Sequence, residues 1–296
     1  MSGRGDGAGH LVRALRPLHW TKNALVFVPA AMAHEITDPS VLIDGAVAFL
    51  SFCLCASGAY LINDLADIEF DRRHPRKRHR PIASGAVSGS VASVLAAVLL
   101  AGGIVLGAAL PNGFWIVVSG YVAATLAYSA FLKRLVLVDV LVLAGLYTLR
   151  LFGGGIGTRI PLSPWLLAFS MFFFLGLAVL KRYSELRTSA APDGGGLRGR
   201  AYLRADMDVL RSVGTASGYL SVLVLALYIN SEAVSALYTN ALGLWLIGPV
   251  LIYWITRLWL LAHRGEMHED PIVFAAKDPA SYAVGAAIAL LLLVAA

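Results

Sequence analysis

Four oxygen-bearing side chains follow the second apolar run of the chain at a spacing that gathers them on a helix. Asn63, Asp67 and Asp71 are four residues apart, and Asp64 lies three residues before Asp67. If the apolar run continues as a helix, these side chains share one face. Like charges at this spacing destabilise a helix, so an offsetting cation is expected. Mg²⁺ prefers carboxylate and phosphate oxygens, and the segment predicts a Mg²⁺ site with Asp64, Asp67 and Asp71 as ligands.

A strongly basic loop comes directly after these acids. Residues 72–80 contain six Lys and Arg, interrupted by Pro75. Metal-binding acids beside cationic donors suit a pyrophosphate group, and Lys77, Arg78 and Arg80 are the candidate donors. For the acids taken alone, the alternative is a solvated helix end whose carboxylates pair with nearby arginines.

The composition places this chemistry in a membrane protein. Of 296 residues, 58% are hydrophobic and only 14% are charged, and the mean hydropathy is +0.73. So few charges cannot cover a soluble core, which excludes an ordinary soluble enzyme and a disordered chain. The long continuous apolar runs do not fit a β-barrel. Cys53 and Cys55 are too few for a disulfide framework or a zinc site and read as small core residues.

The apolar runs predict an all-α, polytopic membrane protein. A membrane helix needs about 20 apolar residues, and about nine runs approach that length. We expect one transmembrane domain over residues 1–296, with spans near 18–34, 41–63, 89–110, 113–131, 135–153, 163–181, 208–230, 237–262 and 279–296.

The basic residues predict the orientation. About 22 of the 24 Lys and Arg lie at the N-terminus or in alternate loops, whereas the other loops carry only Arg159. The positive-inside rule puts the N-terminus and the basic loops in the cytoplasm and the C-terminus outside, in a bacterial-type inner membrane. Arg13 and Arg16 before the apolar run 24–33 imitate a secretory signal, but Lys22 separates them from that run and the rest of the chain is equally apolar, so cleavage is not expected.

Six segments of the chain then carry a resemblance to a known family. Residues 63–71 have the N-D-x-x-D-x-x-x-D form of the UbiA superfamily of intramembrane prenyltransferases, and residues 128–134 are similar to its Y-S-x-x-L-K-R motif. More narrowly, residues 16–23, 74–85, 181–186 and 265–271 resemble the decaprenyl-phosphate phosphoribosyltransferases. This resemblance covers essentially the whole chain, and its H-P-x-K-R-x-R-P-I-A-S-G run is its most specific part.

The resemblance implies helices around a central cavity, with Mg²⁺ and a diphosphate under cytoplasmic loops. It implies transfer of 5-phosphoribosyl from phosphoribosyl pyrophosphate to a polyprenyl phosphate, with pyrophosphate released. The expected catalytic residues are Lys22, Asp67, Asp71 and Tyr128. The expected substrate-binding residues are Asn63, Asp64, Lys77, Arg78, Arg80, Lys133, Arg134, Lys181, Arg182 and Glu185.

One departure from the superfamily separates its branches. Typical members carry a second aspartate-rich motif after the sixth helix, whereas this chain has Lys181, Arg182 and Glu185 there. Two cations suit the additional 5-phosphate of phosphoribosyl pyrophosphate better than a second metal-bound prenyl diphosphate. A phosphate nucleophile is ionised at neutral pH, so no general base is assigned to His74 or His79.

Two readings remain as alternatives. One is transfer of a prenyl group from a prenyl diphosphate to an aromatic acceptor, and the other is a lipid or solute transporter. No nucleic-acid partner is expected, and assembly into a homo-oligomer stays open. Among charges within the spans, we expect Asp139 to orient a basic residue and Arg150 to pair across helices. The glycines of residues 153–157 permit either close packing or a helix break.

Overall fold

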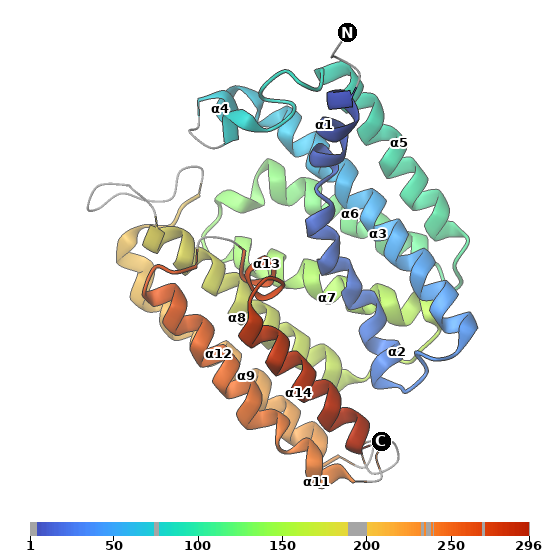
Figure 1. Cartoon of the computed structure of the whole chain (residues 1–296), viewed down its shortest axis with the longest axis vertical. Helices are drawn as coiled ribbons and strands as arrows, with labels where there is room; N and C mark the ends of the chain where they lie inside the picture. The colour runs from blue at the N-terminus through green and yellow to red at the C-terminus, as the bar shows by residue number, and fades with distance from the viewer. Residues whose placement is uncertain are drawn as a thin grey trace. The chain divides into compact units, whose positions relative to one another are not determined.

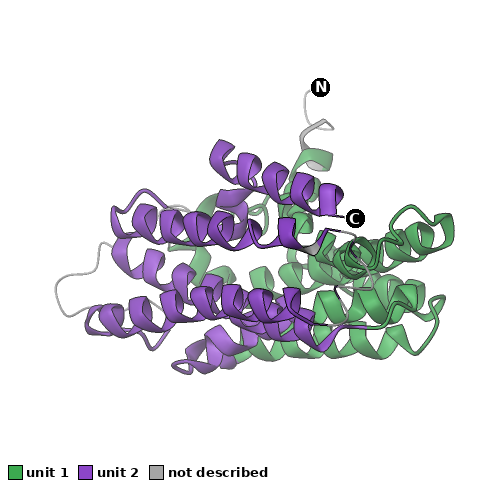
Figure 2. Ribbon diagram, turned by 90° about the horizontal axis from the view of Figure 1, so that it is seen from below, with its two compact units in different colours: residues 1–130, 149–161 green, residues 131–148, 162–296 purple. Residues whose placement is uncertain are grey.

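The computed structural model describes residues 5–73, 77–188, 200–231, 234, 238, 240–267 and 270–295. Every regular element in these ranges is a helix (Figure 1). The chain divides into two compact units, residues 1–130 with 149–161 and residues 131–148 with 162–296 (Figure 2). We call them unit 1 and unit 2. The predicted all-α class is confirmed. The prediction of a single domain remains a prediction.

The helices of unit 1 are built around α3. In chain order they are α1 (Gly5–Leu15), η1 (Pro17–Phe27), α2 (Val28–Met32), α3 (Pro39–Ala66), α4 (Ile68–Arg72), η2 (Lys77–His79), α5 (Gly89–Ala108) and α6 (Phe114–Ala130). Helix α3 packs along α5 through small residues. A Cβ on Gly103 would lie 2.5 Å from the sulfur of Cys55, so only glycine permits this approach. Cys53 and Cys55 are fully buried there, as predicted.

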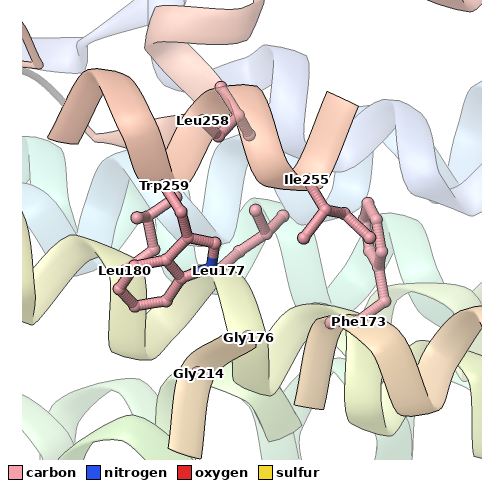
Figure 3. A pocket seen from close by; sticks show the side chains of 9 residues that line it. Phe173, Gly176, Leu177, Leu180, Gly214, Ile255, Leu258 and Trp259 are labelled. Atoms are coloured by element: carbon pink, nitrogen blue, oxygen red, sulfur yellow. The ribbon is translucent and has the colours of Figure 1, made fainter. Parts of the chain in front are cut away.

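Unit 2 contains the C-terminal helices. Its elements are η3 (Leu132–Arg134), the first part of α7 (Val138–Thr158), α8 (Pro164–Thr188), η4 (Arg204–Asp206), α9 (Met207–Ile229), α11 (Ala241–Leu244), α12 (Ile247–His263), α13 (Pro271–Ala275) and α14 (Pro279–Ala295). A small apolar cavity lies where α8, α9 and α12 meet, between Phe173, Ile255 and Trp259 (Figure 3). Gly214 lies so close to Trp259 that a Cβ there would approach the indole ring to 2.3 Å.

The helices confirm an integral membrane protein. Among the described residues, six are long and apolar enough to span a bilayer: α3, α5, α7, α8, the run 204–229 that includes α9, and the run 242–263 that includes α12. Two more apolar helices, α6 and α14, are shorter. The expected total of about nine spans is therefore not established.

The first expected span is not a regular α-helix, and in this respect the prediction was wrong. Residues 17–27 form a 3₁₀ helix, and a separate short helix begins at Val28 with Pro29 in its first turn. Proline lacks the backbone N–H that would continue the preceding hydrogen-bond ladder. The segment packs tightly, since a Cβ on Gly154 would lie 2.1 Å from the carbonyl oxygen of Val26.

Helix α7 continues through residues 153–157, so its glycines serve close packing and not a break.

Candidate functional site

The acidic segment lies in unit 1, where α3 gives way to α4. Helix α3 ends at Ala66, and Asp67 separates it from α4. The expectation of one uninterrupted helix is therefore wrong at Asp67. The Asp71 N–H still donates to the Asp67 carbonyl at 2.8 Å, so the four-residue spacing survives the interruption. Asp64 and Asp71 are buried, whereas Asn63 and Asp67 are partly exposed.

Two arginines hold the buried acids. Arg16 Nη2 donates to both carboxylate oxygens of Asp64, at 2.6 and 2.8 Å. Arg80 Nη1 contacts Asp64 at 3.1 Å and Asp71 at 2.6 Å. The sequence did not decide which residues of the basic loop turn inward, and the structure places Arg80 against the acids, a pairing with nearby arginines that the alternative interpretation expected. Arg16 is a contact that the sequence interpretation missed as a site residue, although its place directly before Pro17 in a matching motif was a signal.

The donor set fits a divalent cation at the level of chemistry. Asp71 is only 1% exposed, and its Oδ1 has no hydrogen-bond partner. A buried carboxylate oxygen in this state is costly unless something satisfies it. Within the described residues, no three Asp, Glu, His or Cys side chains already stand close enough to enclose a metal. Asp64 and Asp71 converge on Arg80.

The remaining candidates of unit 1 lie on η1, α6 and the segment around η2. Lys22 is buried in η1. The Lys77 ammonium lies 5.7 Å from the centroid of the Phe70 ring. Arg78 is exposed and donates to the neighbouring His79 at 3.3 Å. Tyr128 is partly exposed near the end of α6. His74 and the rest of 74–76 lie outside the described residues, as do the predicted loop 191–196 and residues 268–269 of the last matching motif.

A second charged cluster occupies unit 2 and is centred on Arg182 of α8. This side chain is fully buried. Its Nε donates to Asp139 at 2.5 Å and its Nη1 donates to Glu185 at 2.5 Å. Lys181 pairs with Asp270 at 2.8 Å. The prediction that Asp139 orients a basic residue is confirmed, and the structure brings Arg182 and Glu185 together.

Residues just before η4 complete this cluster, and the sequence interpretation missed them. The Tyr202 hydroxyl donates to Asp139 at 2.5 Å and accepts from the Leu137 N–H at 2.9 Å. Burial, and then the hydrogen bond to Asp139, raise the pKa of Tyr202. Arg200 lies 3.4 Å from Asp139 and 3.6 Å from Glu185. No motif marked these residues, because their partners are 15 to 65 positions away.

The other predicted residues have separate surroundings. Lys133 and Arg134 form the short η3 of unit 2, where Arg134 is exposed. Arg150 lies in the part of α7 that belongs to unit 1. It donates to Asn23 at 2.7 Å and to the Tyr121 hydroxyl at 2.8 Å, so its expected pairing across helices is confirmed.

Comparison with known proteins gives the wider context. The protein y4nM of Sinorhizobium fredii, itself uncharacterized, is 40% identical over 276 residues, 93% of this chain and 54% of that protein. The chain thus spans about half the length of that relative. The nodulation protein NoeC of Azorhizobium caulinodans is 36% identical over 278 residues, 90% of this chain and 87% of its own.

A named enzyme matches a shorter part of the chain. The decaprenyl-phosphate phosphoribosyltransferase of Mycobacterium tuberculosis is 41% identical over 193 residues, 61% of this chain and 63% of that enzyme. A UbiA homologue from Archaeoglobus fulgidus, solved with GPP and Mg²⁺, has the same fold, with a TM-score of 0.71 at 19% identity over 96% of this chain and 97% of that one. The sequence profile of the UbiA prenyltransferase family matches residues 24–282. The chain belongs to the UbiA prenyltransferase family.

Proposed function

We propose that this membrane transferase moves 5-phosphoribosyl from phosphoribosyl pyrophosphate to a polyprenyl phosphate of the decaprenyl type. An oxygen of the prenyl phosphate attacks C1 of the ribose, the bond from C1 to the pyrophosphate oxygen breaks, and its electron pair leaves with pyrophosphate. The transition state has oxocarbenium character, so binding the leaving group and aligning the nucleophile are the main tasks of the protein.

The observation that carries this proposal is the set of three basic side chains in the cluster of unit 2, which pair there with Asp139, Glu185 and Asp270. Lys181, Arg182 and Arg200 gather there with Glu185, at the position where other branches of the family carry a second aspartate-rich motif. Cationic donors recognise a phosphate group directly. Phosphoribosyl pyrophosphate has a 5-phosphate remote from its leaving group, whereas a prenyl diphosphate has none. The partial similarity to decaprenyl-phosphate phosphoribosyltransferases supports the same assignment.

The acids of unit 1 are assigned to the leaving group. Asp64, Asp67 and Asp71, supported by Asn63, would hold a divalent cation, Mg²⁺ in this proposal, which supplies charge neutralisation for the departing pyrophosphate. The remaining basic and polar candidates bind phosphate oxygens or the lipid phosphate: Lys22, Lys77, Arg78, Arg80, Tyr128, Lys133 and Arg134. The bacterial inner membrane, a cytoplasmic N-terminus and an external C-terminus follow from the distribution of basic residues.

Reconstitution with defined substrates tests the proposal. Purified full-length protein is given labelled phosphoribosyl pyrophosphate, polyprenyl phosphate and Mg²⁺, and lipid-linked phosphoribose is the expected product. A parallel reaction receives a prenyl diphosphate and an aromatic acid. Turnover only in the second reaction would overturn the proposal in favour of prenyl transfer.

Two substitutions test the metal assignment. Asp67→Ala and Asp71→Ala should each lower turnover by about a hundredfold or more, since each removes a group that stabilises charge in the transition state. Asp208→Asn is the control, because Asp208 is 87% exposed and pairs only at the surface with Arg211. Full activity in both alanine variants would contradict the assignment.

A further inference from the structure

One nitrogen of Arg80 occupies the point where two buried carboxylates meet. Arg80 Nη1 lies 3.1 Å from Asp64 Oδ1 and 2.6 Å from Asp71 Oδ2. A guanidinium normally distributes several donors over its partners. Here a single atom joins both acids, so this atom takes the place that a cation bridging the two carboxylates would take.

The two arginines of the cluster are not held equally. Arg16 makes two hydrogen bonds to Asp64, and its guanidinium carbon lies 4.8 Å from the centroid of the Tyr60 ring. Arg80 holds both acids through one nitrogen, and its side chain is 26% exposed. Arg80 is therefore the arginine that leaves at the smaller loss of contacts.

Asp71 shows that the pairing with Arg80 is incomplete. Its Oδ2 accepts from Arg80, but its buried Oδ1 accepts from no group. A divalent cation satisfies more carboxylate oxygens than one N–H does, because it coordinates six or more oxygen atoms. Exchange of Arg80 for such a cation would satisfy this oxygen.

We propose that Arg80 is an exchangeable counter-ion: a divalent cation displaces it from Asp64 and Asp71, and its freed guanidinium binds the phosphate oxygens of the substrate. The inference rests on the divalent cation of the proposed function and adds an order of events to it. Displacement of Arg80 makes its guanidinium, a planar and permanently charged donor suited to phosphate, available to the substrate. Without the metal, Arg80 and Arg16 together offset the charges of the two buried carboxylates.

Chemical labelling of the unaltered protein tests the exchange. Phenylglyoxal modifies accessible arginines, and mass spectrometry of the purified full chain reports the rate at Arg80. Mn²⁺ alone should raise this rate by about fivefold or more, and inorganic pyrophosphate added with Mn²⁺ should lower it again. Arg73, 83% exposed and paired only loosely with Glu69 at 3.8 Å, is the internal control and should label at a constant rate. An Arg80 rate that Mn²⁺ leaves unchanged or lowers would overturn the proposal.

Metal affinity supplies a second test that needs no turnover. Arg80→Gln removes the competing charge, so calorimetry should show Mn²⁺ binding about tenfold tighter than in the unaltered protein, since hydrogen bonds to charged groups each contribute that order of effect. Arg73→Gln should leave the affinity unchanged. Equal or weaker binding in Arg80→Gln would mean that Arg80 does not compete with the metal.

The outcomes separate this inference from the proposed function. If the unaltered protein binds no Mn²⁺, the metal assignment fails and the exchange fails with it. If Mn²⁺ binds but labelling of Arg80 does not respond, only the exchange is refuted. If Arg80→Gln does not fold, the labelling of the unaltered protein still decides.

Discussion

Changing Asp139 to asparagine keeps the shape of a fully buried side chain and removes its charge. Arg182, also fully buried, then loses the carboxylate that faces its Nε at 2.5 Å. Removing one partner of a buried ion pair typically costs about 3–5 kcal/mol, because the other charge stays desolvated. Glu185 still accepts from Nη1 of Arg182, so we expect the lower end, about 3 kcal/mol.

The Asp139→Asn effect is measured as the midpoint of thermal unfolding in detergent. About 3 kcal/mol corresponds to a loss of roughly 6 °C for a chain of this size. Asp208→Asn is the matched control, since the same chemical change at an exposed pair should cost below about 1 kcal/mol. In the double variant Asp139→Asn with Arg182→Met, removal of both charges should recover part of the loss. Equal midpoints for the two single variants would refute the reasoning.

Two further predictions concern packing and pH. In a chemical denaturation experiment, Gly103→Ala should lower the free energy of unfolding by about 1–3 kcal/mol, because its Cβ would meet the sulfur of Cys55 at 2.5 Å. Gly102→Ala is the control, since the space around Gly102 is open, and it should be neutral or slightly stabilising. The guanidinium of Arg257 lowers the pKa of Asp278. The stabilisation by this pair is therefore complete above the unfolded-state pKa of about 4 and is lost as pH falls through the lower folded-state pKa. The stability difference between the unaltered protein and Asp278→Asn should shrink below about pH 4, and a constant difference from pH 7 to pH 3 would contradict this prediction.

Hydropathy was enough to predict most long helices of this chain. A bilayer-length apolar run has few alternatives to a helix, because every backbone group must find a partner within the segment. The same rule does not specify whether an α-helix or a 3₁₀ helix forms. Residues 17–32 were expected to form a span, yet they form a 3₁₀ segment and a short helix that contains Pro29. The close approach of Val26 to Gly154 is a packing contact that hydropathy does not report.

The site was predictable only in its local parts. The spacing of Asp64, Asp67 and Asp71 is visible in the sequence, and so is the basic loop that contains Arg80. The residues that were missed hold their partners over long separations, as Arg16 does with Asp64 across 48 positions. Periodicity reports what lies on one helix face, and it cannot report which distant loop packs on that face.

Several basic residues of the candidate site are already paired with carboxylates, so the number of basic residues alone does not predict how tightly an anion binds. Arg80, Lys181 and Arg182 were predicted as phosphate donors, and each one contacts a carboxylate in the structure. A phosphate that binds such a residue must replace an existing ion pair, so its affinity is the difference between two charge-assisted interactions. An exposed cation such as Arg134 offers an anion its full but solvent-screened attraction. Selectivity among phosphates is therefore expected to come from the paired residues, because only a ligand with matching geometry, or one that brings its own cation, can displace their carboxylates.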